Sequence, residues 1–306
     1  MDKPQDKIKT LVLLDSHAIL HRSFHALPSF SSPAGEPTGA VYGFTAVLLK
    51  IIRELKPDYL AACYDLPEPT FRHIAYKEYK IQRPKMDDEL IGQIGKSREV
   101  LGAFKIPICE FPGFEADDIL GTIAEKVEDE KNLKVIIASG DLDTLQLVKD
   151  EEVVVYMLSK GVNEAIFYGE KAVKERYGFE PKLLSDYRGL RGDPSDNIIG
   201  VPGIGEKSAG ELIKKFGSLD NIYKQIKKDE SELLKAGIKA RVVQLLKENE
   251  EKARFSKELA RIRADAPIPF VLSEASWKET YDAEKVTFLF EKMGFKSLLA
   301  RLPIIH

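Results

Sequence analysis

The chain has 306 residues, with 46 Lys and Arg against 49 Asp and Glu, a formal net charge of -3 and 43% hydrophobic residues. This composition is ordinary for a globular protein, and the length allows one large domain or two smaller ones. Because there is no basic excess, a nucleic-acid-binding role would need local basic patches beside local acidic ones. No apolar run is long enough to span a membrane, and the polar residues 1–7 hold no signal sequence. Cys63 and Cys109 are isolated and offer no disulfide framework, which fits a reducing cytoplasm.

Three short apolar runs predict strands of a parallel sheet, namely residues 9–15, 58–65 and 133–139. Helical patterns at residues 40–55 and 85–104 lie between them. This alternation indicates βαβ units with right-handed crossovers. We therefore predict an α/β fold whose central, mostly parallel sheet is flanked by helices.

Acidic residues gather at the carboxyl ends of these runs: Asp15, Asp65, Asp141 and Asp143. Ligands of parallel sheets bind beyond those ends. A single Asp at the end of a strand is typical of a turn or a helix cap. Three strands that end alike favour a shared site instead.

A further acidic group, Glu115, Asp117 and Asp118, precedes an apolar-periodic helix. Taken alone, such a group is typical of negative charge at an ordinary helix N-terminus, where the free N–H groups are positive. Glu115 and Asp118 share a helix face, whereas Asp117 points elsewhere. Glu115 and Asp117 can therefore meet only if Glu115 lies in the cap, before regular helix.

Carboxylates that are brought together repel one another, and a divalent cation removes that repulsion. Oxygen ligands without a Cys or His cluster suit Mg²⁺ or Mn²⁺ rather than zinc. The acids exceed what one ion needs, and two ions about 4 Å apart could clamp the attacking and leaving oxygens of a phosphodiester. The pattern predicts a metal-dependent phosphoryl-transfer site.

Cationic and aromatic residues alternate between Pro67 and Pro84. If this segment is helical, five of them fall on one face: Arg72, Tyr76, Tyr79, Lys80 and Arg83. Such a face can simply be solvated. Beside an acidic site, however, it favours phosphates held by charge and bases stacked on rings.

The second half of the chain adds two acids on a tight turn, Asp193 and Asp196. A Gly-x-Gly turn then opens a helix, and its residues are Gly203, Gly205, Lys207 and Ser208. Such a turn directs backbone N–H groups at a phosphate, although many Gly turns only join two helices. Residues 218–264 are helical and highly charged by pattern, and a final helix is predicted over residues 283–299.

Six sequence motifs are specific when they are taken together and in order. They are LD with HRSFHALP at residues 14–15 and 21–28, FRHxxYxxYKxxRP at 71–84, GFEADD at 113–118, SGDxD at 139–143, GDxSDNI at 192–198 and VPGIGxK at 201–207. The chain resembles, over essentially its whole length, the 5′-nuclease domain at the N-terminus of bacterial DNA polymerase I, within the flap endonuclease family.

The resemblance implies metal ligands at the matching acids. A first ion would be served by Asp15, Asp65, Glu115 and Asp117, and a second by Asp141, Asp143 and Asp196, with Asp117 between the two ions. Two further acids, Asp118 and Asp193, would act on the metal ions from further out or through water.

The resemblance also implies a helical arch near residues 68–104 that covers single-stranded 5′ DNA, with Lys80 touching the scissile phosphate. The predicted DNA contacts are Arg22, Phe24, His25, Arg72, Tyr76, Tyr79, Lys80, Arg83, Gly203, Gly205, Lys207 and Ser208. The turn from Val201 to Lys207 would be a helix–two-turn–helix element, which in the family grips duplex backbone and often holds K⁺ through its carbonyls. We divide the chain into an α/β nuclease core, residues 1–185, and a helical DNA-binding region, residues 186–306.

The implied function is that of a structure-specific 5′-nuclease, with Lys80, Arg83 and Asp117 as its catalytic residues. Its expected partners are DNA with 5′ flaps, nicks or gaps, including RNA-primed ends, and we expect a monomer. A non-catalytic binder of branched DNA is one alternative, but binding alone does not need carboxylates, which repel DNA. An RNA-cleaving nuclease of similar acidic fold is another, which the arch and the Gly turn disfavour.

Overall fold

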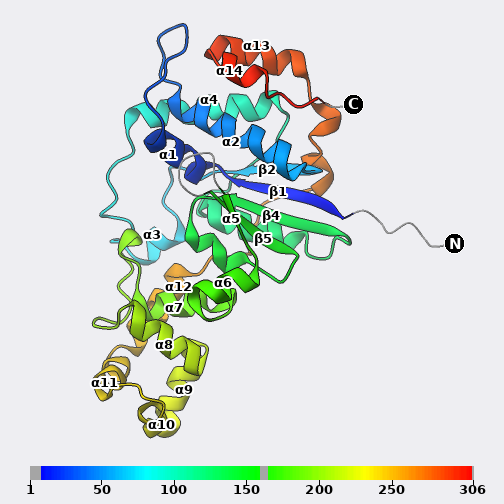
Figure 1. Ribbon diagram of the computed structural model, residues 1–306. Coiled ribbons are helices and arrows are strands. Elements are labelled where there is room, and N and C mark those ends of the chain that lie inside the picture. The colour runs from blue at the N-terminus through cyan, green and yellow to red at the C-terminus, as the bar shows by residue number, and fades with distance from the viewer. Residues whose placement is uncertain (1–7, 159–164, 305–306) are drawn as a thin grey trace, which may run out of the picture.

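The computed structural model describes residues 8–158 and 165–304, and its core is a six-stranded sheet between helical layers (Figure 1). The strand order is β3-β2-β1-β4-β5-β6. The parallel strands are β1 (Lys9–Asp15), β2 (Tyr59–Cys63), β3 (Ile108–Cys109), β4 (Leu133–Ser139) and β5 (Val153–Leu158). Only β6 (Ala165–Tyr168) pairs antiparallel, with β5. The predicted mostly parallel sheet is confirmed.

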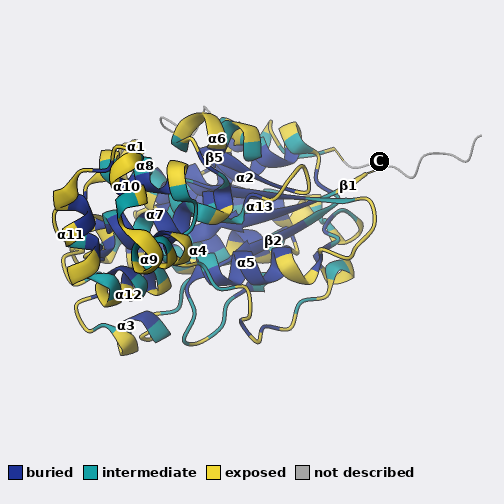
Figure 2. Ribbon diagram, turned by 90° about the horizontal axis from the view of Figure 1, so that it is seen from below, coloured by how far each residue is buried: buried dark blue, intermediate teal, exposed yellow. Residues whose placement is uncertain are grey.

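The strands are buried on both faces, as their continuous apolar runs require. Along β1, Leu11 and Leu13 face one hydrophobic core, and Val12 and Leu14 face the other. The first core includes α5 (Ala116–Lys126), and the second includes α2 (Gly39–Leu55), α4 (Asp88–Ala103) and α13 (Ala283–Met293). Figure 2 shows this buried centre within an exposed rim.

The helix α1 (Ser16–Ala26) begins where β1 ends, at the carboxyl edge of the sheet. Asp15 caps it, because its Oδ1 accepts a hydrogen bond from the backbone N–H of Ala18 at 3.1 Å. Gly43 lets α2 lie directly against α1, since a Cβ at this position would be 2.5 Å from the Cβ of Ser23.

The second half of the described chain is mostly helical. Its helices are α6 (Glu170–Tyr177), α7 (Leu184–Arg191), α8 (Glu206–Phe216), α9 (Leu219–Asp229), α10 (Ser231–Lys235), α11 (Ala240–Glu248) and α12 (Glu250–Ala260). The last of these returns to pack along α7, while α8 to α11 extend away from the sheet (Figure 1). Short 3₁₀ segments lie at Leu142–Leu147, Pro181–Leu183, Pro194–Asp196, Leu272–Ala275 and Lys278–Thr280.

The end of the described chain returns to the α/β core. The predicted final helix is divided into α13 and α14 (Lys296–Leu299) by Gly294, which has φ +79. Both helices pack in the same hydrophobic core as α2 and α4. No helix within residues 8–158 and 165–304 is long and apolar enough to cross a membrane.

The prediction of one helical face from Arg72 to Arg83 is wrong. Only α3 (Phe71–Ala75) is helical there, and residues 77–82 form turns. Tyr76 is extended (φ -144, ψ 103), and Lys80 is left-handed with φ 56. A contact with the turn after α7 overrides the helical periodicity, because Lys80 donates its backbone N–H to the carbonyl of Asp196.

Candidate active site

An open cavity of about 630 Å³ lies at the carboxyl edge of the sheet. Seven of the predicted metal ligands line it, and these are Asp15, Asp65, Glu115, Asp117, Asp141, Asp143 and Asp196. They come from the ends of β1, β2 and β4, from the start of α5 and from the turn after α7. The structure therefore brings together acids that are far apart in the sequence.

Ser139 joins the acids of two neighbouring strands. Its Oγ donates to Oδ2 of Asp15 at 2.6 Å and accepts from the backbone N–H of Asp141 at 2.9 Å. Burial, with the charges of Asp65 and Asp141, raises the pKa of Asp15 from 3.8 to about 7, although hydrogen bonds from Ser139 and Ala18 oppose that rise. Asp15 is therefore an acid that resists ionisation unless a cation approaches.

Asp117 lies among other acids. Burial, followed by the charges of Asp15, Asp141 and Asp65, raises its pKa well above the ordinary value. Glu115 is the N-cap of α5, with φ -90 and ψ 162, which is the condition for its side chain to meet that of Asp117. As the side chains stand in the described residues, no three His, Cys, Asp or Glu converge closely enough to hold a metal ion.

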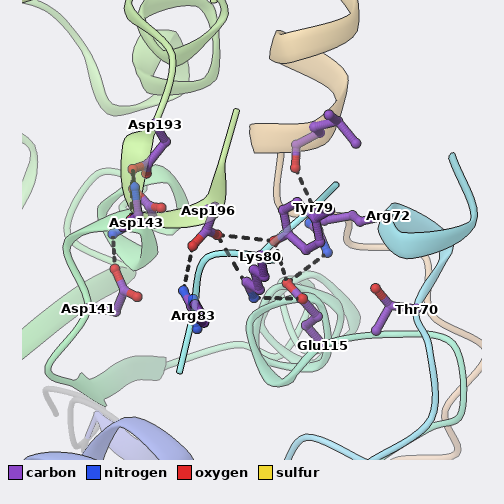
Figure 3. A network of polar contacts seen from close by, with 12 residues as sticks. Thr70, Arg72, Tyr79, Lys80, Arg83, Glu115, Asp141, Asp143, Asp193 and Asp196 are labelled. Atoms are coloured by element: carbon purple, nitrogen blue, oxygen red, sulfur yellow. Dashed lines mark hydrogen bonds and ion pairs between the residues drawn. The ribbon is translucent and has the colours of Figure 1, made fainter. Parts of the chain in front are cut away.

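Cations of the turn segment neutralise two of the acids (Figure 3). Lys80 Nζ lies 2.7 Å from Oε1 of Glu115 and 3.9 Å from Oδ2 of Asp196, and Arg83 pairs with Oδ1 of Asp196. Burial alone would raise the pKa of Glu115, but the charges of Lys80 and Arg72 lower it below the ordinary value. In this arrangement, Lys80 and Arg83 balance the negative charge of one predicted ligand of the first ion, Glu115, and of one predicted ligand of the second ion, Asp196.

Tyr79 is a structural link rather than an exposed stacking surface. Its side chain is 4% exposed, and its hydroxyl oxygen lies 3.1 Å from Oε2 of Glu115 and 3.1 Å from Oδ2 of Asp196. The hydroxyl has one proton, so it can donate to one of the two at a time. The predicted stacking of a DNA base on Tyr79 is contradicted by this burial.

Arg72 and Asp118 form a buried ion pair that the sequence did not predict. Their exposed fractions are 3% and 0%, and the guanidinium reaches both carboxylate oxygens at 2.7 and 2.9 Å. Its remaining donors go to Oε2 of Glu115 and to the carbonyls of Leu259 and Arg261. The structure thus contradicts a DNA contact at Arg72, because its guanidinium is fully engaged with protein. Asp118 was predicted to act on the metal ions from further out or through water, and that role stays a prediction. Together, Arg72 and Asp118 hold Glu115 in place.

Asp193 also lies outside the cavity lining. Its Oδ1 accepts hydrogen bonds from the backbone N–H and the hydroxyl of Ser195, and its Oδ2 pairs with Nη1 of Arg188 at 2.8 Å. Nη2 of the same arginine pairs with Oδ1 of Asp143. Sequence reasoning did not single out Arg188.

Two histidines in the cavity were also missed, His17 and His21. The Nδ1 atom of His17 accepts the backbone N–H of Asp65 at 3.0 Å, so this imidazole helps to place the end of β2. Both lie on the first turns of α1, directly after Asp15. Their mutual spacing of one helical turn, at the start of the segment that follows Asp15, was the signal that could have found them.

The remaining predicted DNA contacts lie at or beyond the cavity rim. Arg22 lines the cavity, Phe24 packs partly into the core that contains α2, and the exposed His25 ring contacts that of His21 at 4.6 Å. Tyr76 packs edge-on against Phe255. The other four, Gly203, Gly205, Lys207 and Ser208, lie at the start of α8, away from the cavity (Figure 1).

An acidic cavity at the carboxyl edge of a parallel sheet, supplied with Lys and Arg from a neighbouring segment, is the arrangement of an α/β enzyme acting on phosphate esters. Residues 10–178 match the 5′-3′ exonuclease N-terminal resolvase-like domain, and residues 179–283 match the 5′-3′ exonuclease C-terminal SAM fold. The chain therefore belongs to the 5′-3′ exonuclease family, and the resemblance drawn from the motifs is confirmed at this level.

Relatives and solved structures agree with this assignment. DNA polymerase I of Bacillus caldotenax is 41% identical over 294 residues, and that of Bacillus subtilis (strain 168) is 40% identical over 294 residues. Each match covers 96% of this chain but 32% of the relative, so the chain spans about a third of those proteins.

Two solved structures share the fold. T5 5′-exonuclease with bound zinc has a TM-score of 0.68 at 18% identity, covering 93% of this chain and 100% of that one. The catalytic core of Rad2 in complex with a DNA substrate has a TM-score of 0.56 at 18% identity, covering 97% of this chain and 93% of that one. At these identities the likeness establishes the fold alone.

Proposed function

We propose that this chain is a structure-specific 5′-nuclease that hydrolyses DNA phosphodiesters at 5′ flaps, nicks and gaps, including RNA-primed ends. The observation that carries the proposal is the meeting of seven acids in one cavity with Lys80 and Arg83 beside them. Family membership supports 5′-to-3′ cleavage. The likeness to DNA polymerase I supports a cytoplasmic role in primer removal and repair.

The donor set fits divalent ions, and the proposal includes two of them, Mg²⁺ or Mn²⁺. All the cavity acids are oxygen donors. Burial, together with neighbouring like charge, raises the pKa of Asp15 and Asp117, so a cation there would stabilise their ionised forms. The first ion would be held by Asp15, Asp65, Glu115 and Asp117, and the second by Asp117, Asp141, Asp143 and Asp196. Bound ions would supply positive charge for the attacking and leaving oxygens of the phosphodiester. Side-chain rotations are needed, since no three acids within residues 8–158 and 165–304 converge closely enough to hold an ion.

Lys80 and Arg83 are proposed to act on the phosphate. Both now pair with Glu115 or Asp196, and both keep access to solvent, with 21% and 50% of their side chains exposed. Once divalent ions neutralise those acids, the two cations are free to turn toward phosphate oxygens. Charge placed in advance at this point stabilises the transition state more than the ground state.

Duplex binding is proposed to lie elsewhere, at the start of α8. Gly203 has φ 90, Gly205 is the N-cap of α8, and Lys207 follows in its exposed first turn. Free backbone N–H groups and a cation suit a phosphate of the duplex, and the carbonyls of the turn suit K⁺. Arg22, His25 and Tyr76 would complete the DNA surface between the two sites.

The test is cleavage of a 5′-labelled flap by the chain acting as a monomer, with product sizes read on a gel. Products that end near the flap junction, formed with Mg²⁺ and absent with chelator, are expected. Tight flap binding without cleavage in Mg²⁺ or Mn²⁺ would instead support the non-catalytic binder. Faster cleavage of single-stranded RNA than of the DNA flap would support the RNA nuclease.

A further inference from the structure

Arg188 joins two acids that the chain places on different elements. Its Nη2 pairs with Oδ1 of Asp143, which follows β4, and its Nη1 pairs with Oδ2 of Asp193 at 2.8 Å, in the turn after α7. The arginine side chain is 15% exposed, so the contact is largely shielded from water. Figure 3 shows Asp143 and Asp193 side by side.

The arginine is presented by a rigid element. On either side of it in α7, Tyr187 and Leu190 are 4% and 0% exposed, and the carbonyl of Leu190 accepts the backbone N–H of Val201 at 2.9 Å. Asp186, two residues before Arg188, accepts the backbone N–H of Leu219 at 2.7 Å and pairs with Lys257 of α12. A side chain that leaves such a fixed helix has few alternative positions.

Asp193 is held just as firmly. It forms a two-way backbone bridge with Ile198, each N–H donating to the other carbonyl at 2.8 Å. Gly192 has φ 76, and a Cβ there would lie 2.5 Å from the carbonyl oxygen of Ile198, so this position requires glycine. Asp193 therefore gives Arg188 a fixed anchor, and Arg188 in turn fixes Asp143.

Asp143 keeps one oxygen for the cavity. Its Oδ1 is taken by Arg188, whereas no hydrogen bond to its Oδ2 occurs within residues 8–158 and 165–304. Its neighbours Asp141 and Asp193 carry like charge, and that repulsion would push its side chain away without a cation. A guanidinium can bond two carboxylates in a fixed fork, which an ammonium cannot do as well.

We propose that Arg188 is a positioning residue that fixes Asp143 to hold the second divalent ion, with Asp193 as its anchor. The inference rests on the proposed function. It deepens that function by assigning Asp193 to anchor Arg188, instead of acting on the metal ion itself. Removing a group that orients a metal ligand costs about 10- to 100-fold in metal affinity. Only the affinity for the second ion should fall, because the acids proposed for the first ion do not contact Arg188.

The experiment measures Mn²⁺ binding to the whole chain without DNA, by the electron paramagnetic resonance signal of free Mn²⁺. Wild type is expected to bind two ions. Arg188→Ala is expected to weaken one of them at least about 10-fold and to leave the other unchanged. Arg188→Lys should recover part of that loss. The control is Arg191→Ala, since Arg191 is on the same helix but pairs with Glu206 at 3.7 Å, and it should bind Mn²⁺ as wild type does.

Each other outcome has a defined meaning. Two unchanged ions in Arg188→Ala would overturn the positioning role, and so would lost cleavage with normal Mn²⁺ binding, which would make Arg188 a DNA contact. An equal loss of Mn²⁺ affinity in Arg191→Ala would also overturn the positioning role, because the effect would not be specific to Arg188. If wild type cleaves flaps but binds only one ion, the role of Arg188 is refuted while the proposed nuclease function is retained. If wild type binds no Mn²⁺, the proposed metal-dependent function is refuted as well. Should Arg188→Ala fail to fold, Arg188→Lys decides, because it must still weaken one ion.

Discussion

Replacing Arg72 with alanine should destabilise the protein strongly, because the guanidinium is the partner of the fully buried Asp118. Breaking a buried ion pair from one side costs about 3–5 kcal/mol, since the other charge is left unpaired in the interior. The carbonyls of Leu259 and Arg261 also lose their donors, so the upper half of that range is expected. With roughly 2–4 °C of Tm per kcal/mol for a chain of this size class, Tm should fall by on the order of 10 °C.

The assay is thermal unfolding followed by circular dichroism, with Arg83→Ala as the matched control. Arg83 is half exposed and pairs with Asp196, and such an ion pair contributes about 0–1 kcal/mol, so Tm should change by no more than roughly 4 °C. A double-mutant cycle of Arg72 and Asp118 should show strong coupling between them. If Arg72→Ala instead keeps its Tm and loses flap affinity, Arg72 is a DNA contact and the reasoning from its burial is refuted.

Three further predictions concern rate, salt and pH. Lys80→Ala should lower the saturated single-turnover rate by roughly 10²-fold and change flap affinity little, whereas Lys207→Ala should mainly weaken binding; the reverse pattern would contradict the separation of the two sites. Flap affinity should fall steeply with salt, since each neutralised phosphate adds to the slope, and a flat plot of log K against log salt would contradict a basic track. Because the pKa of Asp15 is raised from 3.8 to about 7, its contribution to stability is present below pH 3.8 and is lost as the pH rises through 7. In chelator, Asp15→Asn should therefore gain Tm relative to wild type between pH 4 and 7, and a constant difference would argue against the raised pKa.

Continuous apolar runs made parts of the sheet predictable. The strands β1 and β4 have the bounds that the sequence predicted, because residues buried on both faces leave an unbroken hydrophobic run. β5 (Val153–Leu158) has the same kind of pattern and could have been predicted with them. β3 has two residues, which is too short to show any period.

Local pattern failed where long-range contacts decide the structure. The spacing of cations and rings from Arg72 to Arg83 fits a helix, yet Arg72 turns inward to Asp118 and Tyr79 inserts between Glu115 and Asp196. Those partners lie between 36 and 117 residues away in the sequence, so no local window contains them. The cavity acids that follow β1, β2 and β4 were predictable for the opposite reason, since the carboxyl ends of parallel strands lie at one edge of the sheet.

The most direct test of the central claim is Asp117→Ala, measured for flap cleavage in Mg²⁺ and for flap binding in Ca²⁺. Asp117 is the proposed ligand between both ions, and four other carboxylates act on its charge, namely Asp15, Asp141, Asp65 and Glu115. We predict that cleavage falls by several orders of magnitude while binding in Ca²⁺ is retained. Turnover near that of wild type would contradict the assignment of this acidic cavity as the active site.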